Sequence, residues 1–395
     1  MATFTSIPIL DLSLINLPCQ KAKFLAQLRE ALVVVGFFYL KNITLWIPES
    51  VKSEFEKQAM ALCNQPLEKK LEIDMINSKH FLGYSRQGLE RTARKLDYRE
   101  MFDFLTPQEA PGPDDPVYLN IQGPNQWPDE KELPGFRKAV EDYLSVISEL
   151  GNLMVGLVAE ALDIEPTTMR PLFGNPPRNK LSLLKYPVPP NEPPRDQVET
   201  DKGGICQEED DVMQGVGPHK DGGFLTYLLQ STPHAGLEAQ NKCGSWIPVP
   251  PLPDTLVVNV GRSLESITGG VCTATTHRVN LRAEYFRGEQ GESLGPRFSF
   301  PVFQTLRPDV SSAEMQSLEL PPHILDLVKD EKVRSDAEAY FSNYHRESPG
   351  LGIFTARLTS HPDVGRRWYP DLVSRVLKEQ EDFNNGGIVV VPPKS

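Results

Sequence analysis

Cysteine is scarce in this sequence and does not occur in pairs. The 395 residues include five cysteines, an odd number, and no CxxC motif. This spacing excludes metal or redox sites built on paired thiols and argues against a framework of disulfides. We therefore expect reduced thiols and a cytoplasmic protein.

Long apolar runs and an excess of positive charge are also missing. No uninterrupted apolar stretch reaches the roughly 18 residues that a membrane-spanning helix needs, and Met1–Pro8 lacks the basic start of a signal peptide. The 41 Lys and Arg residues are outnumbered by 53 Asp and Glu residues, for a net charge of −12. Because nucleic acids and anionic membranes bind basic faces, we expect neither as a partner. We expect a small-molecule substrate instead, and a monomer or a weak homodimer.

Apolar periodicity favours helices before residue 180 and strands after it. Helical spacing predicts helices at 20–35, at 49–63 and from 134 to about 161. Short runs of branched and aromatic residues then alternate with Gly and Pro clusters, which is typical of strands. The predicted strands are 181–186, 224–230, 255–260, 273–279 and 297–305. This pattern predicts a mainly β fold with flanking helices, either a sandwich or a jelly roll.

We expect one integrated structural unit made of three regions. A mostly helical N-terminal region, residues 1–180, would pack on a catalytic jelly-roll core at 181–310, and residues 311–395 would form C-terminal helices and a tail. Within the core, the segment 188–217 is acidic and rich in Pro and Gly. This composition predicts an exposed, mobile loop.

One pair of residues has the spacing of metal ligands. His219 and Asp221 stand two apart at the head of a strand-like run, so their side chains project from the same face. His277 follows 58 residues later, in another predicted strand. Two imidazoles and one carboxylate leave positions open on a metal, which is typical of non-haem Fe(II) oxygenases. An isolated HxD motif is often a chance occurrence, so this interpretation needs support from other residues.

That support comes from a predicted carboxylate clamp. Arg297 and Ser299 also share one face of a strand, and a guanidinium beside a hydroxyl is suited to binding a carboxylate. Tyr186, at the end of an earlier predicted strand, can donate a further hydrogen bond. An arginine that points into a β core needs an anionic partner, since otherwise it is a buried uncompensated charge.

The order HxD, distant His and RxS resembles the isopenicillin N synthase-like branch of the Fe(II)/2-oxoglutarate-dependent dioxygenases. The resemblance extends from Ile7 to about Pro370. It is carried by the segments Ile7–Leu12, Gly36–Phe38, Gly83–Tyr84, Asp97–Phe104, Gly236–Glu238, Trp246–Val249, Val258–Gly261 and Thr268–Gly270.

The resemblance implies a double-stranded β-helix core that uses Fe(II), 2-oxoglutarate and O2. The implied iron ligands are His219, Asp221 and His277. The implied 2-oxoglutarate clamp consists of Arg297, Ser299 and Tyr186, while Phe303 and Tyr84 would contact the substrate. The implied reaction is hydroxylation or desaturation of a small molecule in secondary metabolism, with succinate and CO2 as coproducts.

Departures from the family pattern leave alternatives open. Leu184 stands where many plant members have Asn, and the acidic segment is an insertion relative to them. An Fe(II) oxidase that uses O2 without 2-oxoglutarate, fragmentation of 2-oxoglutarate to ethylene, and a jelly-roll binding protein without activity remain alternative interpretations. Of the other histidines, His234 follows a turn-like Ser-Thr-Pro run, and we expect it to be solvated.

Overall fold

The computed structural model describes residues 3–88, 91–92, 95–190, 213–328, 330–344 and 348–384. Most of the predicted acidic loop, 188–217, therefore lies outside the described residues, and its mobility stays a prediction. Its predicted C-terminal end is wrong, because the chain from Met213 onward forms a largely buried strand, β8 (Met213–His219).

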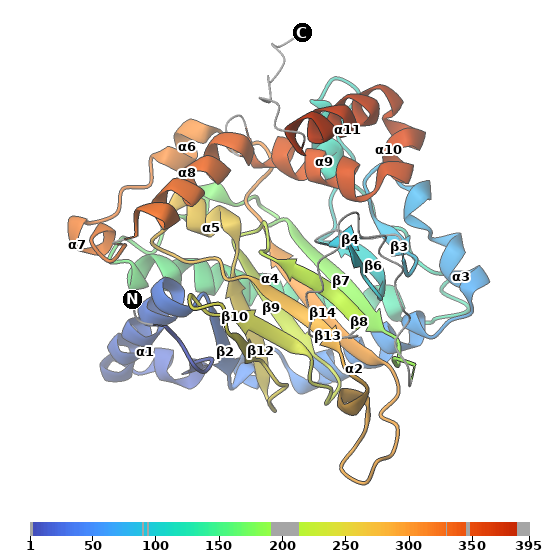
Figure 1. Ribbon diagram of the computed structural model, residues 1–395, viewed down its shortest axis with the longest axis horizontal. Helices are drawn as coiled ribbons and strands as arrows, with labels where there is room; N and C mark the ends of the chain where they lie inside the picture. Colours follow the sequence, from blue (N-terminus) through green and yellow to red (C-terminus); the bar gives the residue numbers. More distant parts are fainter. Residues whose placement is uncertain are drawn as a thin grey trace, which may run out of the picture.

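Two β-sheets form the centre of the molecule (Figure 1). The larger sheet contains, in spatial order, β1 (Ile9–Asp11), β2 (Phe37–Lys41), β12 (Thr255–Val260), β9 (Leu225–Gln230), β14 (Arg297–Gln304), β7 (Asn179–Tyr186), β6 (Glu100–Leu105) and β3 (Gly83–Ser85). The smaller sheet contains β11 (Trp246–Pro248), β10 (Leu237–Gln240), β13 (His277–Leu281) and β8. A separate hairpin pairs β4 (Arg91–Thr92) with β5 (Lys95–Leu96). The fold thus has a β-sheet centre with flanking helices, and because the described helices contain more residues than the strands, the expectation of a mainly β composition is wrong.

The larger sheet draws strands from both sides of residue 180. β1 and β2 form one edge and β6 and β3 the other, while the four strands between them come from the chain after residue 178. All neighbouring pairs are antiparallel except β1 with β2. The N-terminal part of the chain therefore completes the sheet as well as covering it.

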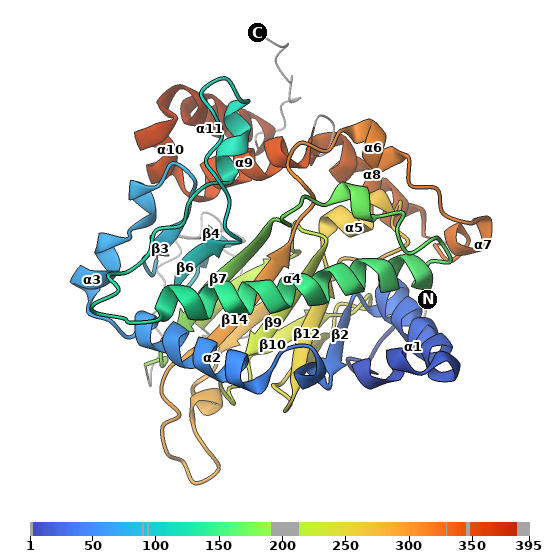
Figure 2. The ribbon, with the colours of Figure 1, turned by 180° about the vertical axis from the view of Figure 1, so that it is seen from behind.

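Helices cover the outer face of the larger sheet and one end of the molecule. The helices are α1 (Pro18–Glu30), α2 (Glu49–Cys63), α3 (Leu67–Glu72), α4 (Phe136–Ala161), α5 (Arg262–Ile267), α6 (Ser312–Gln316), α7 (Pro322–Leu325), α8 (Glu331–Tyr344), α9 (Pro349–Ser360), α10 (Pro362–Trp368) and α11 (Pro370–Asn384). In Figure 2, α4 and α2 lie in front of the larger sheet, across its outer face. Helices α9–α11 lie together near β3 and β6.

Helix α4 is the longest of the described helices and contains a long apolar stretch. Among the described residues it is the one helix that is long and apolar enough to cross a membrane. In this structure 67% of its most apolar window is buried inside the protein. It packs on α2, where Phe55 and Tyr143 stack with ring centroids 3.9 Å apart, so its apolar faces belong to the protein core.

The predicted helix at 20–35 forms as α1 followed by one π-helical turn, Ala31–Val35. Gly36 ends it with a φ of +68°, and a Cβ there would lie 2.0 Å from the carbonyl oxygen of Thr273. Only glycine fits this close approach. The predicted strand at 273–279 begins only at His277, because Thr273 and Thr275 hydrogen-bond the π-helical turn Ala31–Val35 and Ala274 hydrogen-bonds Glu265.

A buried carboxylate ties the C-terminal helices to the larger sheet. Asp103 on β6 accepts hydrogen bonds from Lys180 Nζ on β7 (3.0 and 3.1 Å) and from Arg357 Nη2 on α9 (2.9 Å). Ser182 on β7 also donates to it. Burial alone would raise the pKa of Asp103, but the two cations outweigh it and hold this pKa below its usual range.

We expect Asp103→Asn to lower the free energy of unfolding at pH 7 by about 3–5 kcal/mol, because it leaves buried cations without their carboxylate. The carboxylate stabilises the fold above the unfolded-state pKa of about 3.9, and this contribution is lost as the pH falls toward the lower folded-state pKa. Denaturant unfolding at pH 7 and pH 3 measures it. A difference between Asp103→Asn and wild type that does not shrink at pH 3 would contradict this assignment.

Candidate metal centre and carboxylate clamp

The predicted triad meets where β8 and β13 pair. His219, the last residue of β8, is the direct antiparallel partner of His277, the first residue of β13, and their ring centroids lie 4.2 Å apart. Asp221 follows two residues after His219, and its Oδ1 lies 3.5 Å from His219 Nε2 and 3.7 Å from His277 Nε2. The three potential ligand atoms lie within 4.8 Å of one another. One metal ion fits such a donor set.

Hydrogen bonds orient each ligand toward this common point. The Nδ1–H of His219 donates to the carbonyl of Gly217 (2.8 Å), and that of His277 to the carbonyl of Thr275 (3.1 Å). Because a carbonyl can only accept, each Nδ1 carries the proton and each Nε2 keeps a free lone pair. The imidazoles therefore present their metal-binding nitrogens to Asp221.

The carboxylate of Asp221 is held from the other sheet. Its Oδ2 accepts from Thr226 Oγ1 on β9 (2.6 Å) and from Asn259 Nδ2 on β12 (2.8 Å). This leaves Oδ1 facing His219 and His277. Such outer hydrogen bonds fix the geometry of a ligand and tune its affinity for a metal.

The protonation states suit a metal. Burial and the adjacent His219 lower the pKa of His277 to about 4, so it is neutral at neutral pH. Burial would raise the pKa of Asp221, but the two imidazoles and the amide of Asn259 outweigh it and hold that pKa below its usual value. A carboxylate and a neutral imidazole are the forms in which Asp221 and His277 can bind a divalent cation.

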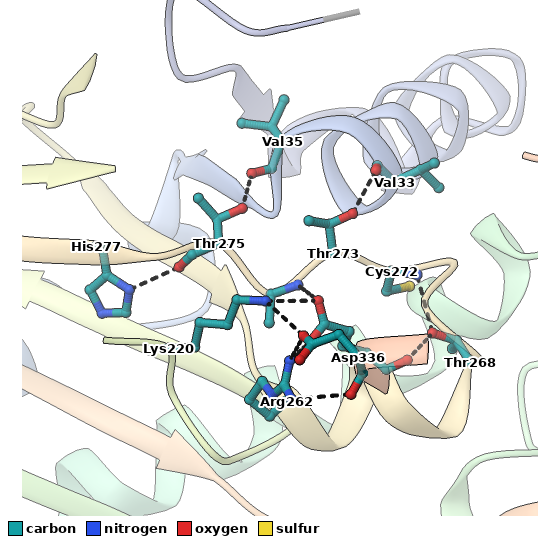
Figure 3. Close-up of polar contacts among 12 residues, drawn as sticks. Val33, Val35, Lys220, Arg262, Thr268, Cys272, Thr273, Thr275, His277 and Asp336 are labelled. Carbon is teal, nitrogen blue, oxygen red and sulfur yellow. Dashed lines mark hydrogen bonds and ion pairs between the residues drawn. The ribbon is translucent and has the colours of Figure 1, made fainter. Parts of the chain in front are cut away.

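Two sets of contacts hold the chain segments that carry the three predicted metal ligands (Figure 3). Thr275, whose carbonyl orients His277, donates its hydroxyl proton to the carbonyl of Val35, at the end of the π-helical turn that follows α1 (2.6 Å). Lys220, between the two HxD ligands, points away from them, and its Nζ lies 3.4 Å from Glu265 on α5 and 3.6 Å from Asp336 on α8.

Arg262 joins this second group of contacts. Its side chain pairs with Glu265 (2.6 Å) and Asp336, and its backbone N–H donates to the carbonyl of Asp221 (2.7 Å). The segment that carries His219 and Asp221 is therefore fixed to both α5 and α8.

The predicted clamp forms on the inner face of the larger sheet. Arg297, the first residue of β14, is 1% exposed and pairs in register with Tyr186 on β7. Its Nη1 donates to Ser299 Oγ (3.2 Å), its Nη2 donates to Gln230 Oε1 on β9 (3.3 Å), and its Cζ lies 4.9 Å from the centre of the Tyr186 ring. Arg297 and Ser299 thus share one face of β14, as the strand period predicts, and Tyr186 at the end of β7 lies beside them.

The guanidinium of Arg297 is a buried cation whose partners in the described part of the chain are all neutral. Its interactions are with Ser299, Gln230 and Tyr186, and no carboxylate is among them. Burial accordingly lowers the pKa of Arg297. Since a buried charge is stable only when it is compensated, this arrangement fits an anionic ligand such as the distal carboxylate of 2-oxoglutarate.

One cavity joins the triad to the clamp. About 480 Å³ of space, partly open to solvent, is lined by residues of both sheets, including the three triad residues, the three clamp residues and Phe303. Phe303 lies beneath Lys180, whose Nζ is 4.6 Å from its ring centre. Most of the remaining lining is apolar, so the cavity can hold a ligand away from water.

Tyr84 is not brought to this cavity. Its hydroxyl donates to Glu100 (2.7 Å), and its buried ring packs on Phe102. The expectation for His234 is wrong: it is 1% exposed, its Nε2 contacts the carbonyl of Gly295 (3.1 Å), and its ring packs on Phe286. The turn that carries His234 packs against the segment before β14, which includes Gly295. The local composition around His234 does not predict this packing.

Sequence reasoning missed Thr226, Asn259, Gln230 and Arg99. The last of these lines the cavity, and the first three contact the triad or the clamp. Each is a polar residue on or beside a strand, a signal that strand alternation alone could have provided for Thr226 and Gln230, which lie four residues apart on β9.

Comparison with known proteins agrees with this geometry. A family model described as non-haem dioxygenase in morphine synthesis N-terminal matches residues 7–130, and one described as 2OG-Fe(II) oxygenase superfamily matches residues 181–305. A 2-oxoglutarate-dependent dioxygenase of Gibberella zeae is 43% identical over 381 residues, covering 96% of each chain. Another from Dothideomycetidae sp. is 39% identical over 384 residues, covering 95% of this chain and 96% of the relative.

A solved structure shares the fold. A full-length Neurospora crassa protein, crystallised in complex with alpha-KG, superposes with a TM-score of 0.66 at 21% identity, covering 89% of this chain and 95% of that one. At this identity the likeness concerns the fold alone. Together, the family models and the full-length relatives show that the chain belongs to the 2OG-Fe(II) oxygenase superfamily and is an Fe(II)- and 2-oxoglutarate-dependent oxygenase.

Proposed function

We propose that the protein hydroxylates or desaturates a small organic molecule, with succinate and CO2 as coproducts, on a double-stranded β-helix core. The observation that carries this proposal is the placement of two complementary features in one cavity. The convergent donor set of His219, Asp221 and His277 fits Fe(II), and buried Arg297 fits a carboxylate. Two facing sheets and the likeness to the Neurospora crassa structure support the core.

The residues of this chain would have distinct tasks. Arg297, Ser299 and Tyr186 bind the distal carboxylate of 2-oxoglutarate and so direct its keto-acid end toward the triad. The apolar lining, with Phe303, excludes water and orients the substrate. When bound, Fe(II) supplies the redox centre at which O2 and 2-oxoglutarate react.

We expect Thr226→Val to weaken metal binding by about 10- to 100-fold while keeping all three ligands, because Asp221 loses one of the hydrogen bonds that fix it. A Co(II) titration followed by absorption measures the affinity without turnover. Thr255→Val is the matched control, since the Thr255 hydroxyl donates only to the carbonyl of Leu252 in a turn before β12. Equal metal affinity in Thr226→Val and Thr255→Val would show that Thr226 does not support the site.

We expect Arg297→Gln to lower the binding affinity for 2-oxoglutarate by at least 10- to 100-fold. Charge-assisted hydrogen bonds are worth about 1.5–3 kcal/mol each, and 1.4 kcal/mol is about a factor of ten. Arg297→Lys should recover only part of the affinity, because an ammonium lacks the planar fork. The measurement is the 2-oxoglutarate dependence of succinate formation.

Arg278→Gln is the control for this experiment, since Arg278 pairs with Glu238 (2.8 Å) and does not line the cavity. An unchanged 2-oxoglutarate dependence in Arg297→Gln would contradict the clamp. Substrate-dependent O2 uptake whose rate does not depend on 2-oxoglutarate would contradict the proposed reaction itself.

A further inference from the structure

Glu265 is a buried charged residue to which the proposed function gives no task. It lies on α5, its side chain is 3% exposed, and it is not among the residues that line the cavity. A buried carboxylate is stable only when cations or hydrogen-bond donors compensate it. The groups that compensate Glu265 come from α5 itself and from the two chain segments that carry the predicted metal ligands.

Glu265 is connected first to the segment that contains His219 and Asp221. Lys220, between these two ligands, places its Nζ 3.4 Å from Glu265 Oε1, and Arg262 Nη1 lies 2.6 Å from Glu265 Oε2. The backbone N–H of Arg262 donates to the carbonyl of Asp221 (2.7 Å). The side chains of Lys220 and Arg262 converge in Figure 3. Both residues thus connect Glu265 to this segment.

The same carboxylate is also connected to the segment that precedes His277. The backbone N–H of Ala274 donates to Glu265 Oε1 (2.9 Å), the oxygen that faces Lys220 Nζ. The next residue, Thr275, has the carbonyl that accepts from the Nδ1–H of His277 (3.1 Å). A displacement of Ala274 would therefore move the carbonyl that orients His277.

The β-ladder is irregular at the place where it joins the two histidines. His219 is the last residue of β8 and His277 is the first residue of β13, so their pair stands at the end of the ladder. The next pair is Val279 with Val216, and the register shifts between the two pairs. Such a shift locally disrupts the ladder. Glu265 supplies a second connection between the two segments at this irregular end.

We propose that Glu265 is a positioning residue of the metal centre, which sets the spacing between the segment 219–221 and His277. It acts through Lys220 and the N–H of Ala274 and does not itself bind the metal. This inference rests on the proposed function and assigns a further residue to the same site. Contacts that fix metal ligands tune the affinity and the geometry of a metal site, so both should depend on Glu265.

The first test is the isosteric variant Glu265→Gln. Its side chain has one acceptor oxygen instead of two, so it cannot hold both cations and the N–H of Ala274 together. We expect Co(II) to bind about tenfold more weakly than to wild type, with a changed visible absorption spectrum, because loss of contacts behind metal ligands costs about 10- to 100-fold in affinity. A Co(II) titration measures both, and near-UV circular dichroism of the metal-free protein checks the fold.

Two controls separate spacing from charge and from general stability. Asp336 pairs with the same cations as Glu265, but it lies on α8 and its side chain is 56% exposed, so Asp336→Asn should keep Co(II) affinity within about twofold. Glu100 is a mostly buried carboxylate shared by Lys70 (2.9 Å) and Lys185 (3.3 Å), away from the triad. Glu100→Gln should lower the thermal unfolding midpoint and leave Co(II) affinity within about twofold, since distant sites act independently.

A second variant, Glu265→Asp, keeps the charge and shortens the side chain by one methylene. We expect it to lower Co(II) affinity by about three- to tenfold, because the shorter side chain cannot reach both segments at once. This variant decides the question if Glu265→Gln does not fold. In the double variant of Lys220→Met with Glu265→Gln, the loss of affinity should be smaller than the product of the two single losses, because both changes break one connection.

Four results would overturn the proposal: Co(II) affinity and spectrum unchanged in Glu265→Gln, affinity unchanged in Glu265→Asp, a loss in Asp336→Asn or Glu100→Gln as large as in Glu265→Gln, or fully multiplicative losses in the double variant. The wild type separates this failure from that of the proposed function. If wild type binds Co(II) and forms succinate while the Glu265 variants bind like it, only the positioning role is wrong. If wild type binds no Co(II) or forms no succinate, the proposed function is wrong.

Discussion

The antiparallel pairing of β13 with β8 is the constraint on which the site depends. It sets His277 opposite His219, although 58 residues separate them in the sequence. Asp221 then turns toward the same point, and Thr226 and Asn259 of the larger sheet hold it there. The triad therefore bridges the two sheets, and its geometry follows from how they pack together.

The buried Arg297 adds an energetic constraint. Taking a guanidinium out of water costs free energy that neutral partners such as Ser299 and Gln230 offset only in part. A carboxylate that reaches this cation completes its compensation. The fold thus holds an incompletely compensated cation in place for ligand binding. The affinity for a dicarboxylic acid follows from this uncompensated charge of Arg297.

The local parts of the site were predictable, and the non-local parts were not. A strand period of two was enough to place Arg297 with Ser299 on β14, and helix spacing set α2 at its observed bounds. His219 and Asp221 do converge, but β8 ends at His219, so the strand predicted to begin there is wrong. The contact of Asn259 with Asp221 depends on strand order in the larger sheet, which one sequence does not determine.

The errors have the same origin. The start of β13 was misplaced because Thr273 and Thr275 hydrogen-bond the π-helical turn that follows α1, a segment 240 residues away in the sequence. His234 was expected in solvent because its turn composition does not show the loop that covers it. Tyr84 has the family pattern but faces Glu100 and the core.

The ion pairs behind the metal centre have an evolutionary consequence. Glu265 is buried and shared by Lys220, which stands between two metal ligands, and Arg262, which begins α5. Losing one cation alone leaves a buried carboxylate poorly compensated beside the triad, whereas a compensating change at the partner position restores the balance. Positions 220, 262 and 265 should therefore covary as a group among relatives, whichever substrate each relative oxidises.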